Sequence, residues 1–347
     1  MAKKQGNRSA AGGKVKVGVI GAGGIAMGIH LPSLRRMESV ELVAVCDLIP
    51  ERAAKAAAEF DIPNTCQSYP QMLQAESLDA VLVLTEPDQL YRPAMACLAA
   101  GKHVFMEKPP GITAYQAGTL LRAARAADRI LMVGLNRRYI PLVQHVLKLV
   151  RQRSTINQVD GRFNKHSSAD FYGGCASALE CDTLHVIDLV RWIAGGQPVK
   201  AALVQGQYDS PVPNSWNGVA MFDNGVTGIV RANYQTAARV QSLEIHGPNA
   251  SAFVNLGFGD ASCTAELMFF GGKGTHSLSS AGAGKQEHLK LDGREIAGSD
   301  DYRVVFGYEA ELRDFIECIQ TRRRPLTDIE EGLKSLQMVE MFRANLL

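Results

Sequence analysis

The chain has 347 residues, of which 46% are hydrophobic and 21% charged, with 37 lysines and arginines against 35 aspartates and glutamates. At roughly 150 residues per domain, this length predicts about two domains. The formal net charge of +2 is too balanced for a protein whose main partner is nucleic acid or an anionic membrane surface. The apolar runs are strand-sized, whereas crossing a bilayer takes roughly 20 residues. The composition therefore predicts a soluble protein that binds neither nucleic acid nor a membrane.

Residues 1–13 contain basic side chains among Gly, Ser, Asn and Ala, and the apolar stretch after them is interrupted by glycines, unlike a secretory signal. We expect a flexible tail over 1–13 and a cytoplasmic protein. The seven cysteines are scattered and include no CxxC pair, so neither a disulfide framework nor a zinc site is indicated.

Between residues 14 and 135, short runs of β-branched residues alternate with longer alanine-rich stretches, which is the pattern of repeated β-α-β units. The runs are almost continuously apolar, as expected for a parallel sheet that is buried on both faces. The pattern predicts a doubly wound α/β domain over residues 14–135, with strands at Val15–Ile20, Glu41–Cys46, Ala80–Leu84, His103–Met106 and Ile130–Val133.

The helices of this first domain have recognisable ends. Pro50 marks the start of one helix, Gly101 the C-terminal end of another, and Thr113 is the expected N-cap of a third. The predicted helices are Glu51–Phe60, Tyr91–Ala100 and Ala114–Ala127.

After about residue 156, polar and apolar residues alternate between Asn-Gly and Pro-Asn turns, which is typical of an antiparallel sheet. We therefore predict a mostly antiparallel, open-sheet α+β domain over residues 136–325 and a C-terminal helix over 326–347. The predicted strands are Val199–Tyr208, Val219–Phe222, Val226–Tyr234, Ser242–His246 and Ala250–Val254.

Three helices are expected in this second half, at Asp182–Ala194, Tyr308–Thr321 and Asp328–Leu346. Thr327 and Glu330 have the spacing of a capping box at the start of the last helix. Residues 273–285 are rich in Gly and Ser and are expected to form a loop or an exposed hairpin.

A glycine-rich motif, Gly21-Ala22-Gly23-Gly24-Ile25-Ala26, directly follows the first predicted strand and opens a helix. In this context Gly21 permits a tight turn, and Gly23 and Gly24 let a pyrophosphate approach the backbone. The N-terminus of the helix, at Ile25, offers free N–H groups to the phosphates. The motif predicts a dinucleotide site, although the same glycines also occur in turns of other α/β proteins.

Asp47 ends the second predicted strand, close to the spacing of roughly 20 residues expected for the acid that binds the adenosine ribose. Its carboxylate would accept from both ribose hydroxyls and repel a 2′-phosphate. We therefore expect NAD rather than NADP as the cofactor, with Arg52 as a residue that could soften the preference.

Lys108 follows the strand His103–Met106 within the run Glu107-Lys108-Pro109-Pro110. A lysine at the carboxyl end of a parallel strand points into the crevice where such sheets bind ligands. Its ammonium group can stabilise a developing alkoxide. From the residues alone, a solvated lysine at the end of a strand is the more common interpretation.

Three segments resemble the family of glucose-fructose oxidoreductase, inositol dehydrogenase and MocA. The first runs from Leu84-Thr85-Glu86-Pro87-Asp88 to Phe105-Met106-Glu107-Lys108-Pro109, the second is Gly134-Leu135-Asn136-Arg137-Arg138-Tyr139, and the third is Glu311-Leu312-Arg313-Asp314-Phe315-Ile316. The resemblance spans nearly the whole chain. It implies a Rossmann domain, a nicotinamide cofactor, a substrate related to sugars or cyclitols, and a homodimer or homotetramer formed through the open face of the second sheet.

The resemblance also implies roles for individual residues. Thr85 and Pro87 would border the nicotinamide, Glu107 would lie by its ribose, and Lys108 would be catalytic. Many family members have a histidine where this chain has Leu90, so one cofactor contact is replaced.

Asp182 and His185 form a second candidate catalytic element, because residues at i and i+3 of a helix share one face. The resemblance makes His185 a catalytic acid or base, and Asp182 could orient it. Many members have the acid four residues before the histidine, where this chain has Cys181, so the role of Asp182 stays open. A metal site formed with Asp188 would share a helix face only loosely, and we expect no metal.

The substrate side is expected to include Asn136, Arg137, His166 and Tyr172, with Arg137 as donor to a hydroxyl or a carboxylate. We predict reversible oxidation of a secondary alcohol on a sugar, cyclitol or related ring. Two alternatives stay open: a relative that uses transient oxidation to break or eliminate a glycosidic bond, and a dinucleotide-binding regulatory protein without catalysis. Turnover without net cofactor reduction would indicate the former.

Overall fold

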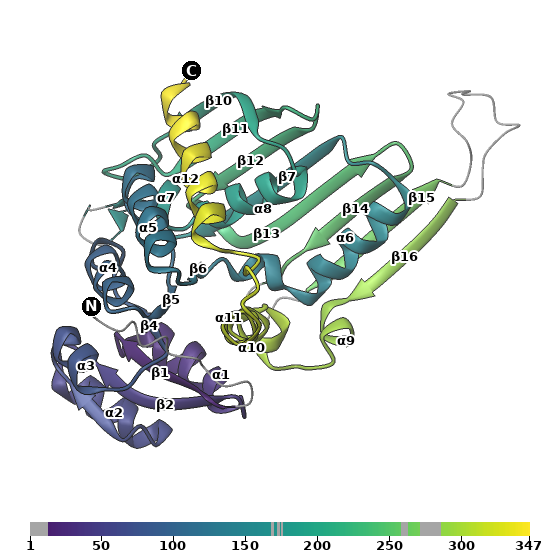
Figure 1. The fold of residues 1–347 in the computed structure, drawn as a ribbon. Coiled ribbons are helices and arrows are strands. Elements are labelled where there is room, and N and C mark those ends of the chain that lie inside the picture. The colour runs from purple at the N-terminus through teal and green to yellow at the C-terminus, as the bar shows by residue number, and fades with distance from the viewer. Residues whose placement is uncertain (1–12, 168–169, 172–173, 175, 258–262, 271–285) are drawn as a thin grey trace, which may run out of the picture.

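The computed structural model describes residues 13–347 apart from 168–169, 172–173, 175, 258–262 and 271–285. The expected tail, except residue 13, and the expected loop over 273–285 therefore lie outside the described residues. The chain forms two sheets with helices packed around and between them (Figure 1). The predicted combination of a doubly wound domain and a mostly antiparallel domain is confirmed.

The first sheet is parallel throughout, with the strand order β3-β2-β1-β4-β5-β6. The order reverses between β1 and β4, and ligands of open α/β sheets bind at such a point. The five predicted strands are all present, and β3 is an addition whose short polar sequence gives no strand pattern. The bounds are β1 Val15–Ile20, β2 Val40–Cys46, β3 Asn64–Cys66, β4 Ala80–Val83, β5 His103–Met106 and β6 Leu131–Val133.

The helices of the first domain follow the predicted ends closely. Pro50 is the first residue of α2, and Thr113 caps α5 by accepting from the backbone N–H of Gln116 at 3.3 Å. Gly101 has a positive φ of 70° just beyond α4. The bounds are η1 Ala26–His30, α1 Leu31–Arg35, α2 Pro50–Phe60, α3 Tyr69–Ala75, η2 Pro87–Gln89, α4 Tyr91–Ala99 and α5 Ala114–Ala127.

The second sheet has eight strands in the order β10-β11-β12-β7-β13-β14-β15-β16, and only the pair β12–β7 is parallel. Sequence patterns missed β7, β15 and β16, although β7 is central. The bounds are β7 Gln158–His166, β10 Pro198–Gly206, β11 Ser215–Phe222, β12 Thr227–Asn233, β13 Gln235–Gly247, β14 Ala250–Asn255, β15 Thr264–Phe270 and β16 Gln286–Asp292, with a small separate pair of β8 Asp170–Phe171 and β9 Ala176–Ser177.

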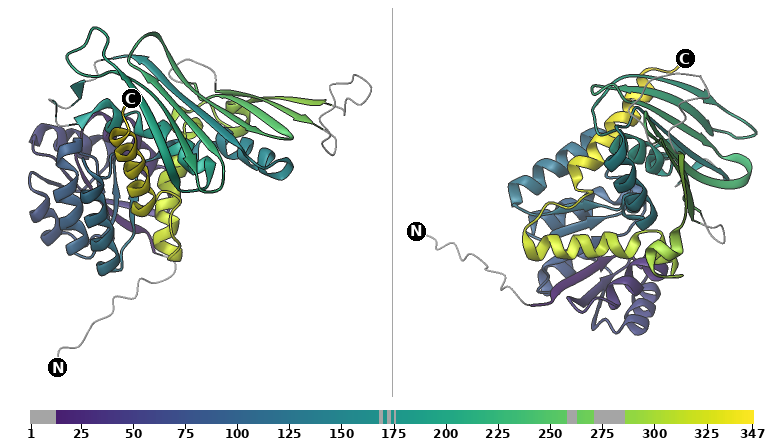
Figure 2. Two further views of the ribbon diagram at one scale, coloured as in Figure 1. Left: turned by 90° about the horizontal axis from the view of Figure 1, so that it is seen from above. Right: turned by 90° about the vertical axis from the view of Figure 1, so that its right-hand side faces the viewer.

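Helices α6, α8 and α12 cover one face of this sheet, and α12 also packs against α5 of the first domain (Figures 1 and 2). On β11, buried and exposed residues alternate, which leaves the other face open. No helix of the described residues is long and apolar enough to cross a membrane. The bounds are η3 Asn136–Tyr139, α6 Pro141–Arg153, α7 Ala178–Cys181, α8 Leu184–Ala194, α9 Gly293–Ala297, α10 Tyr302–Val305, α11 Tyr308–Thr321 and α12 Ile329–Ala344.

One local prediction is confirmed with a later start, and one is wrong. The helix expected around Asp182–Ala194 is α8, which begins at Leu184, because Asp182 has a φ of −123° that is not helical and separates α8 from the short α7. The capping box is replaced by Asp328, which accepts from the N–H of Glu331 at 3.0 Å. The reason is that the carbonyl of Thr327 accepts from Val133 in β6, which holds Thr327 outside the helix.

A pH dependence of stability follows from His103 at the start of β5. Burial lowers the pKa of His103 to about 4, helped by Arg129, and its Nδ1 accepts from the N–H of Ile130 at 3.0 Å. In the unfolded chain this histidine binds a proton below about pH 6.5. The unfolded state therefore gains protons first as the pH falls from 6.5 to 4, and the folded state loses up to about 3 kcal/mol over this range.

Urea unfolding of wild-type protein and of His103→Gln between pH 7 and pH 4 measures this contribution. We expect the free energy of unfolding to fall more steeply with acid in the wild type than in the variant. Equal slopes would show that His103 does not carry this acid sensitivity.

Candidate active site

The glycine motif lies at the reversal point between β1 and β4. Gly21 has φ of 97°, and a Cβ there would lie 2.8 Å from the carbonyl oxygen of Leu84 after β4, so only glycine fits. At Gly23 and Gly24, by contrast, a Cβ would meet no protein atom within 4 Å. Ile25 begins the helix and packs against the core of the first domain. This open space at a helix N-terminus fits a diphosphate.

Asp47 links the end of β2 to this loop. Its Oδ2 accepts from the N–H of Ala22 at 2.8 Å, and its Oδ1 accepts from the N–H of Ile49 at 2.9 Å. The side chain is partly exposed beside the glycine motif. Each carboxylate oxygen has a second lone pair, so Asp47 can accept from ribose hydroxyls while it keeps these two contacts.

Glu107 follows β5 and is held by a residue that the sequence did not indicate. His30, fully buried at the end of η1, lies with its Nε2 2.9 Å from Glu107 Oε1. Burial would raise the pKa of Glu107, but His30 and Lys108 outweigh it, and the pKa is lowered. Glu107 is therefore an ionised acceptor at the edge of the crevice, linked to the helix that follows the glycine motif.

Thr85 and Pro87 follow β4 on the same edge of the sheet. The hydroxyl of Thr85 is buried and has no hydrogen-bond partner among the described residues, so it can accept or donate to a ligand. Leu90, at the position where a family histidine was expected, is fully buried in the core. Where many family members are expected to have a histidine that contacts the cofactor, the side chain of Leu90 packs in the hydrophobic core.

Lys108 connects the two domains. Its Nζ donates to the carbonyl oxygen of Cys181 at 2.9 Å, and this carbonyl belongs to the last residue of α7. A cation at a helix C-terminus is electrostatically favourable. The contact places the ammonium group beside the segment that leads to Asp182 and His185.

Asp182 lies between two lysines. Its carboxylate forms an ion pair with Lys165 of β7 and accepts from the hydroxyl of Tyr234 at 3.2 Å. Burial would raise the pKa of Asp182, but the ammonium groups of Lys108 and Lys165 lower it overall. Asp182 is therefore ionised, and it balances part of the positive charge in the site.

His185 is 4% exposed, and its Nδ1 has no hydrogen-bond partner among the described residues. Burial, followed by the positive charges of Arg137, Lys108 and Lys165, lowers its pKa well below 6.5. The imidazole is therefore neutral at pH 7. The expected orientation of His185 by the Asp182 carboxylate is not seen, because this carboxylate binds Lys165 and Tyr234, and only main-chain atoms connect Asp182 to His185.

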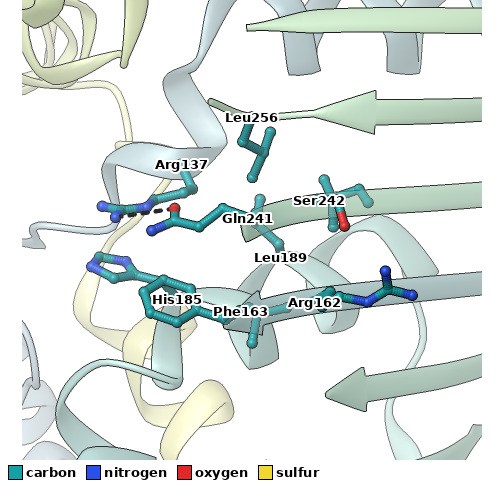
Figure 3. A pocket seen from close by; sticks show the side chains of 10 residues that line it. Arg137, Arg162, Phe163, His185, Leu189, Gln241, Ser242 and Leu256 are labelled. Atoms are coloured by element: carbon teal, nitrogen blue, oxygen red, sulfur yellow. Dashed lines mark hydrogen bonds between the residues drawn. The ribbon is translucent and has the colours of Figure 1, made fainter. Parts of the chain in front are cut away.

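Arg137 and Gln241 lie beside His185 at one end of a small cavity of about 10 Å³ (Figure 3). Arg137 donates to Asn136 Oδ1 at 2.6 Å, and Asn136 is itself held by the carbonyl of Phe306. Of the other expected substrate residues, His166 is exposed at the end of β7, and Tyr172 lies outside the described residues.

Asp188 has a structural partner. It accepts from Arg138 at 2.8 and 2.6 Å and from Ser335 at 2.6 Å. In the described part of the chain, no group of three or more His, Cys, Asp or Glu side chains is arranged to hold a metal ion.

Lys165, Gln241 and His30 are site residues that sequence reasoning missed. Lys165 lies on β7, a strand that was not predicted. Gln241 lies on β13, and the strand predicted there began one residue later, at Ser242. His30 is the last residue of η1, which follows the glycine motif. Its distance from the motif in the sequence does not indicate a role in the site.

Two family models match the chain. The model of an oxidoreductase family with an NAD-binding Rossmann fold matches residues 15–135. The model of the GFO/IDH/MocA C-terminal domain matches residues 160–253.

Individual relatives are distant in sequence. The 4-carboxy-2-hydroxymuconate-6-semialdehyde dehydrogenase of a Sphingobium strain is 28% identical over 199 residues, 55% of this chain and 62% of the relative. The trans-1,2-dihydrobenzene-1,2-diol dehydrogenase of Sus scrofa is 25% identical over 322 residues, 90% of this chain and 87% of the relative. A dehydrogenase structure from Chromobacterium violaceum superposes with a TM-score of 0.83 at 22% identity, covering 96% of this chain and 95% of that one.

The two kinds of glycine in the motif predict opposite outcomes for alanine substitution. Gly23→Ala should leave thermal stability unchanged and weaken NADH binding by about tenfold or more, because its methyl group enters space that only the diphosphate needs. Gly21→Ala should destabilise the fold by about 1–3 kcal/mol, since it adds strain and a collision with Leu84. Calorimetry with NADH and thermal melts measure both effects, and unchanged NADH affinity in Gly23→Ala would contradict the assignment.

Proposed function

The chain belongs to the glucose-fructose oxidoreductase, inositol dehydrogenase and MocA family of nicotinamide-dependent oxidoreductases, and we propose that it oxidises a secondary alcohol on a sugar, cyclitol or related ring. One relative that matches most of the chain is named a trans-1,2-dihydrobenzene-1,2-diol dehydrogenase. This name describes a substrate ring with neighbouring hydroxyl groups, which supports the proposed substrate class. The observation on which the proposal depends is the contact of Lys108 with Cys181, which joins the cofactor crevice to the segment of Asp182 and His185.

The residues would share the chemistry as follows. His185, neutral at pH 7, would take the hydroxyl proton of the substrate, and Lys108 would hold the negative charge that grows on the oxygen. A nicotinamide held in the crevice would supply the hydride acceptor, so that the alcohol loses a hydride from its carbinol carbon and a proton from its hydroxyl, which together are two electrons and two protons. Asp182 would keep Lys165 in place and balance charge.

The cofactor would be held by the glycine motif, Asp47, Thr85, Pro87 and Glu107. The open space at Gly23, the buried unpaired hydroxyl of Thr85 and the partly exposed carboxylate of Asp47 support this assignment. We propose NAD rather than NADP, because the charge of Asp47 would repel a 2′-phosphate.

Replacing Asp47 by Asn tests this cofactor preference. The amide keeps one acceptor oxygen but loses the charge, so we expect the ratio of NADPH to NADH dissociation constants to fall by about tenfold. The control is Asp79→Asn, since Asp79 also accepts from a backbone N–H, that of Lys16 at 2.9 Å, away from the site. Fluorescence titrations give the constants, and tighter NADPH binding by the wild type would overturn the choice of NAD.

Replacing Lys108 by Ala tests the catalytic proposal. We expect NADH binding to persist and turnover to fall by about 10²- to 10⁴-fold, because the variant lacks the group that holds the growing charge. Lys102→Ala is a matched control, since Lys102 also donates to a backbone carbonyl, that of Leu78 at 2.9 Å, at the opposite end of β5. It should retain wild-type turnover.

These assays also separate the alternatives. Full activity of Lys108→Ala would refute the catalytic assignment, and product formation without net NADH would indicate transient oxidation. Tight NAD binding without turnover of any alcohol tested would favour the alternative of a dinucleotide-binding regulatory protein without catalysis.

Assembly and location are proposals as well. We propose a homodimer or homotetramer formed through the open face of the eight-stranded sheet, which exposes Val219, Met221 and Phe253. Sedimentation velocity measures this assembly, and a monomer at micromolar concentration would contradict it. We also propose a cytoplasmic protein, which cell fractionation would test.

A further inference from the structure

Two consecutive buried arginines on η3 have opposite electrostatic surroundings. Arg138 is fully buried and donates to the Asp188 carboxylate with two nitrogens and to Glu331 with a third, at 3.1 Å. Arg137 is 7% exposed and forms no ion pair with any described residue. Its acceptors are the neutral amide oxygens of Asn136 at 2.6 Å and Gln241 at 3.5 Å.

The amides around Arg137 are themselves held in place. Asn136 donates to the carbonyl of Phe306 at 2.9 Å, which turns its oxygen toward Arg137. Gln241 is 3% exposed, and its Nε2 is buried without a partner among the described residues. Figure 3 shows Gln241 between Arg137 and His185, with its oxygen toward the guanidinium group. The site therefore presents N–H donors from two side chains, and no carboxylate of the described residues accepts from them.

The surroundings do not neutralise Arg137. Glu311 of α11 is buried and forms no ion pair with Arg137, and burial and the charge of Glu107 raise its pKa well above 4.5, which favours its uncharged form. Asp182 is already paired with Lys165, and Glu107 with His30. Burying a guanidinium group without a carboxylate is unfavourable, because the charge loses its hydration and gains no opposite charge. A fold that neutralises Arg138 with two carboxylates leaves this cost at Arg137 uncompensated.

We infer that the substrate carries a carboxylate that binds Arg137 and Gln241. The inference rests on the proposed function, because the secondary alcohol of the same molecule would then lie between Lys108 and His185. The planar fork of a guanidinium group matches the two oxygens of a carboxylate. The carboxylate takes no part in hydride or proton transfer and only positions the ring.

Three matched pairs of compounds test the inference with the full chain and NAD. They are D-glucuronate with D-glucose, D-gluconate with D-glucitol, and quinate with its amide, in which the acid of each pair carries a carboxylate where its partner carries a neutral group. We expect kcat/KM to be at least about tenfold higher for the acid of at least one pair. Calorimetry of the NADH complex with the same compounds measures binding without turnover.

Arg137→Gln should lower the ratio of acid to neutral kcat/KM by about 10- to 100-fold, and Arg137→Lys should recover only part of it, since lysine lacks the bidentate fork. The control is Arg35→Gln, which removes one positive charge from an exposed ion pair with Asp61. Arg137→Gln should also melt no lower than wild type, because it removes an uncompensated buried charge. If it does not fold, Arg137→Lys supplies the measurement.

The possible results separate this inference from the proposed function. Preference for neutral alcohols, with a ratio that Arg137→Gln does not change, overturns the carboxylate while the dehydrogenase stands. Binding of an acid that Arg137→Gln abolishes, without turnover, supports the anion site and removes the proposed function. Failure of every acid to bind tighter than its neutral partner refutes the inference.

Discussion

The hydrogen bond from Lys108 to the carbonyl of Cys181 is the contact on which the candidate site depends. Lys108 follows strand β5 of the parallel sheet, and Cys181 ends a short helix that belongs to the second domain. The ammonium group of Lys108 therefore joins the parallel sheet to the segment of the second domain that precedes Asp182. Because the break between α7 and α8 follows directly, the same carbonyl sets the position of Asp182 and His185.

Charge is distributed unevenly around this contact. Away from it, buried charges are neutralised, as in the network of Arg138, Asp188 and Glu331. In the candidate site, several polar atoms are buried without hydrogen-bond partners among the described residues, including the Thr85 hydroxyl, His185 Nδ1 and Gln241 Nε2. Buried polar groups are normally paired, so a concentration of unpaired ones marks a place where a ligand completes the hydrogen bonds.

The first domain was predicted almost entirely from sequence, because strand, turn and helix signals there are local. Pro50 begins one helix, Thr113 caps the N-terminus of another by accepting from a neighbouring backbone N–H, and Gly21 lies in a motif whose order identifies the turn. The second domain was predicted less completely. Strand β7 was missed because it lies at the centre of the sheet with a mixed polar sequence, and its pairing partners are distant in the chain.

The sequence by itself determined the fold class, the dinucleotide motif and the identity of Lys108 and His185 as candidates, since these follow from residue order and short-range spacing. Only the tertiary structure decided what surrounds them. Helical spacing suggested that Asp182 orients His185, yet the chain breaks between α7 and α8, and Lys165 and Tyr234 bind the carboxylate instead. The tertiary structure also gives the adjacent Arg137 and Arg138 different surroundings. The carboxylates that neutralise Arg138 come from helices distant in sequence, and they do not reach Arg137.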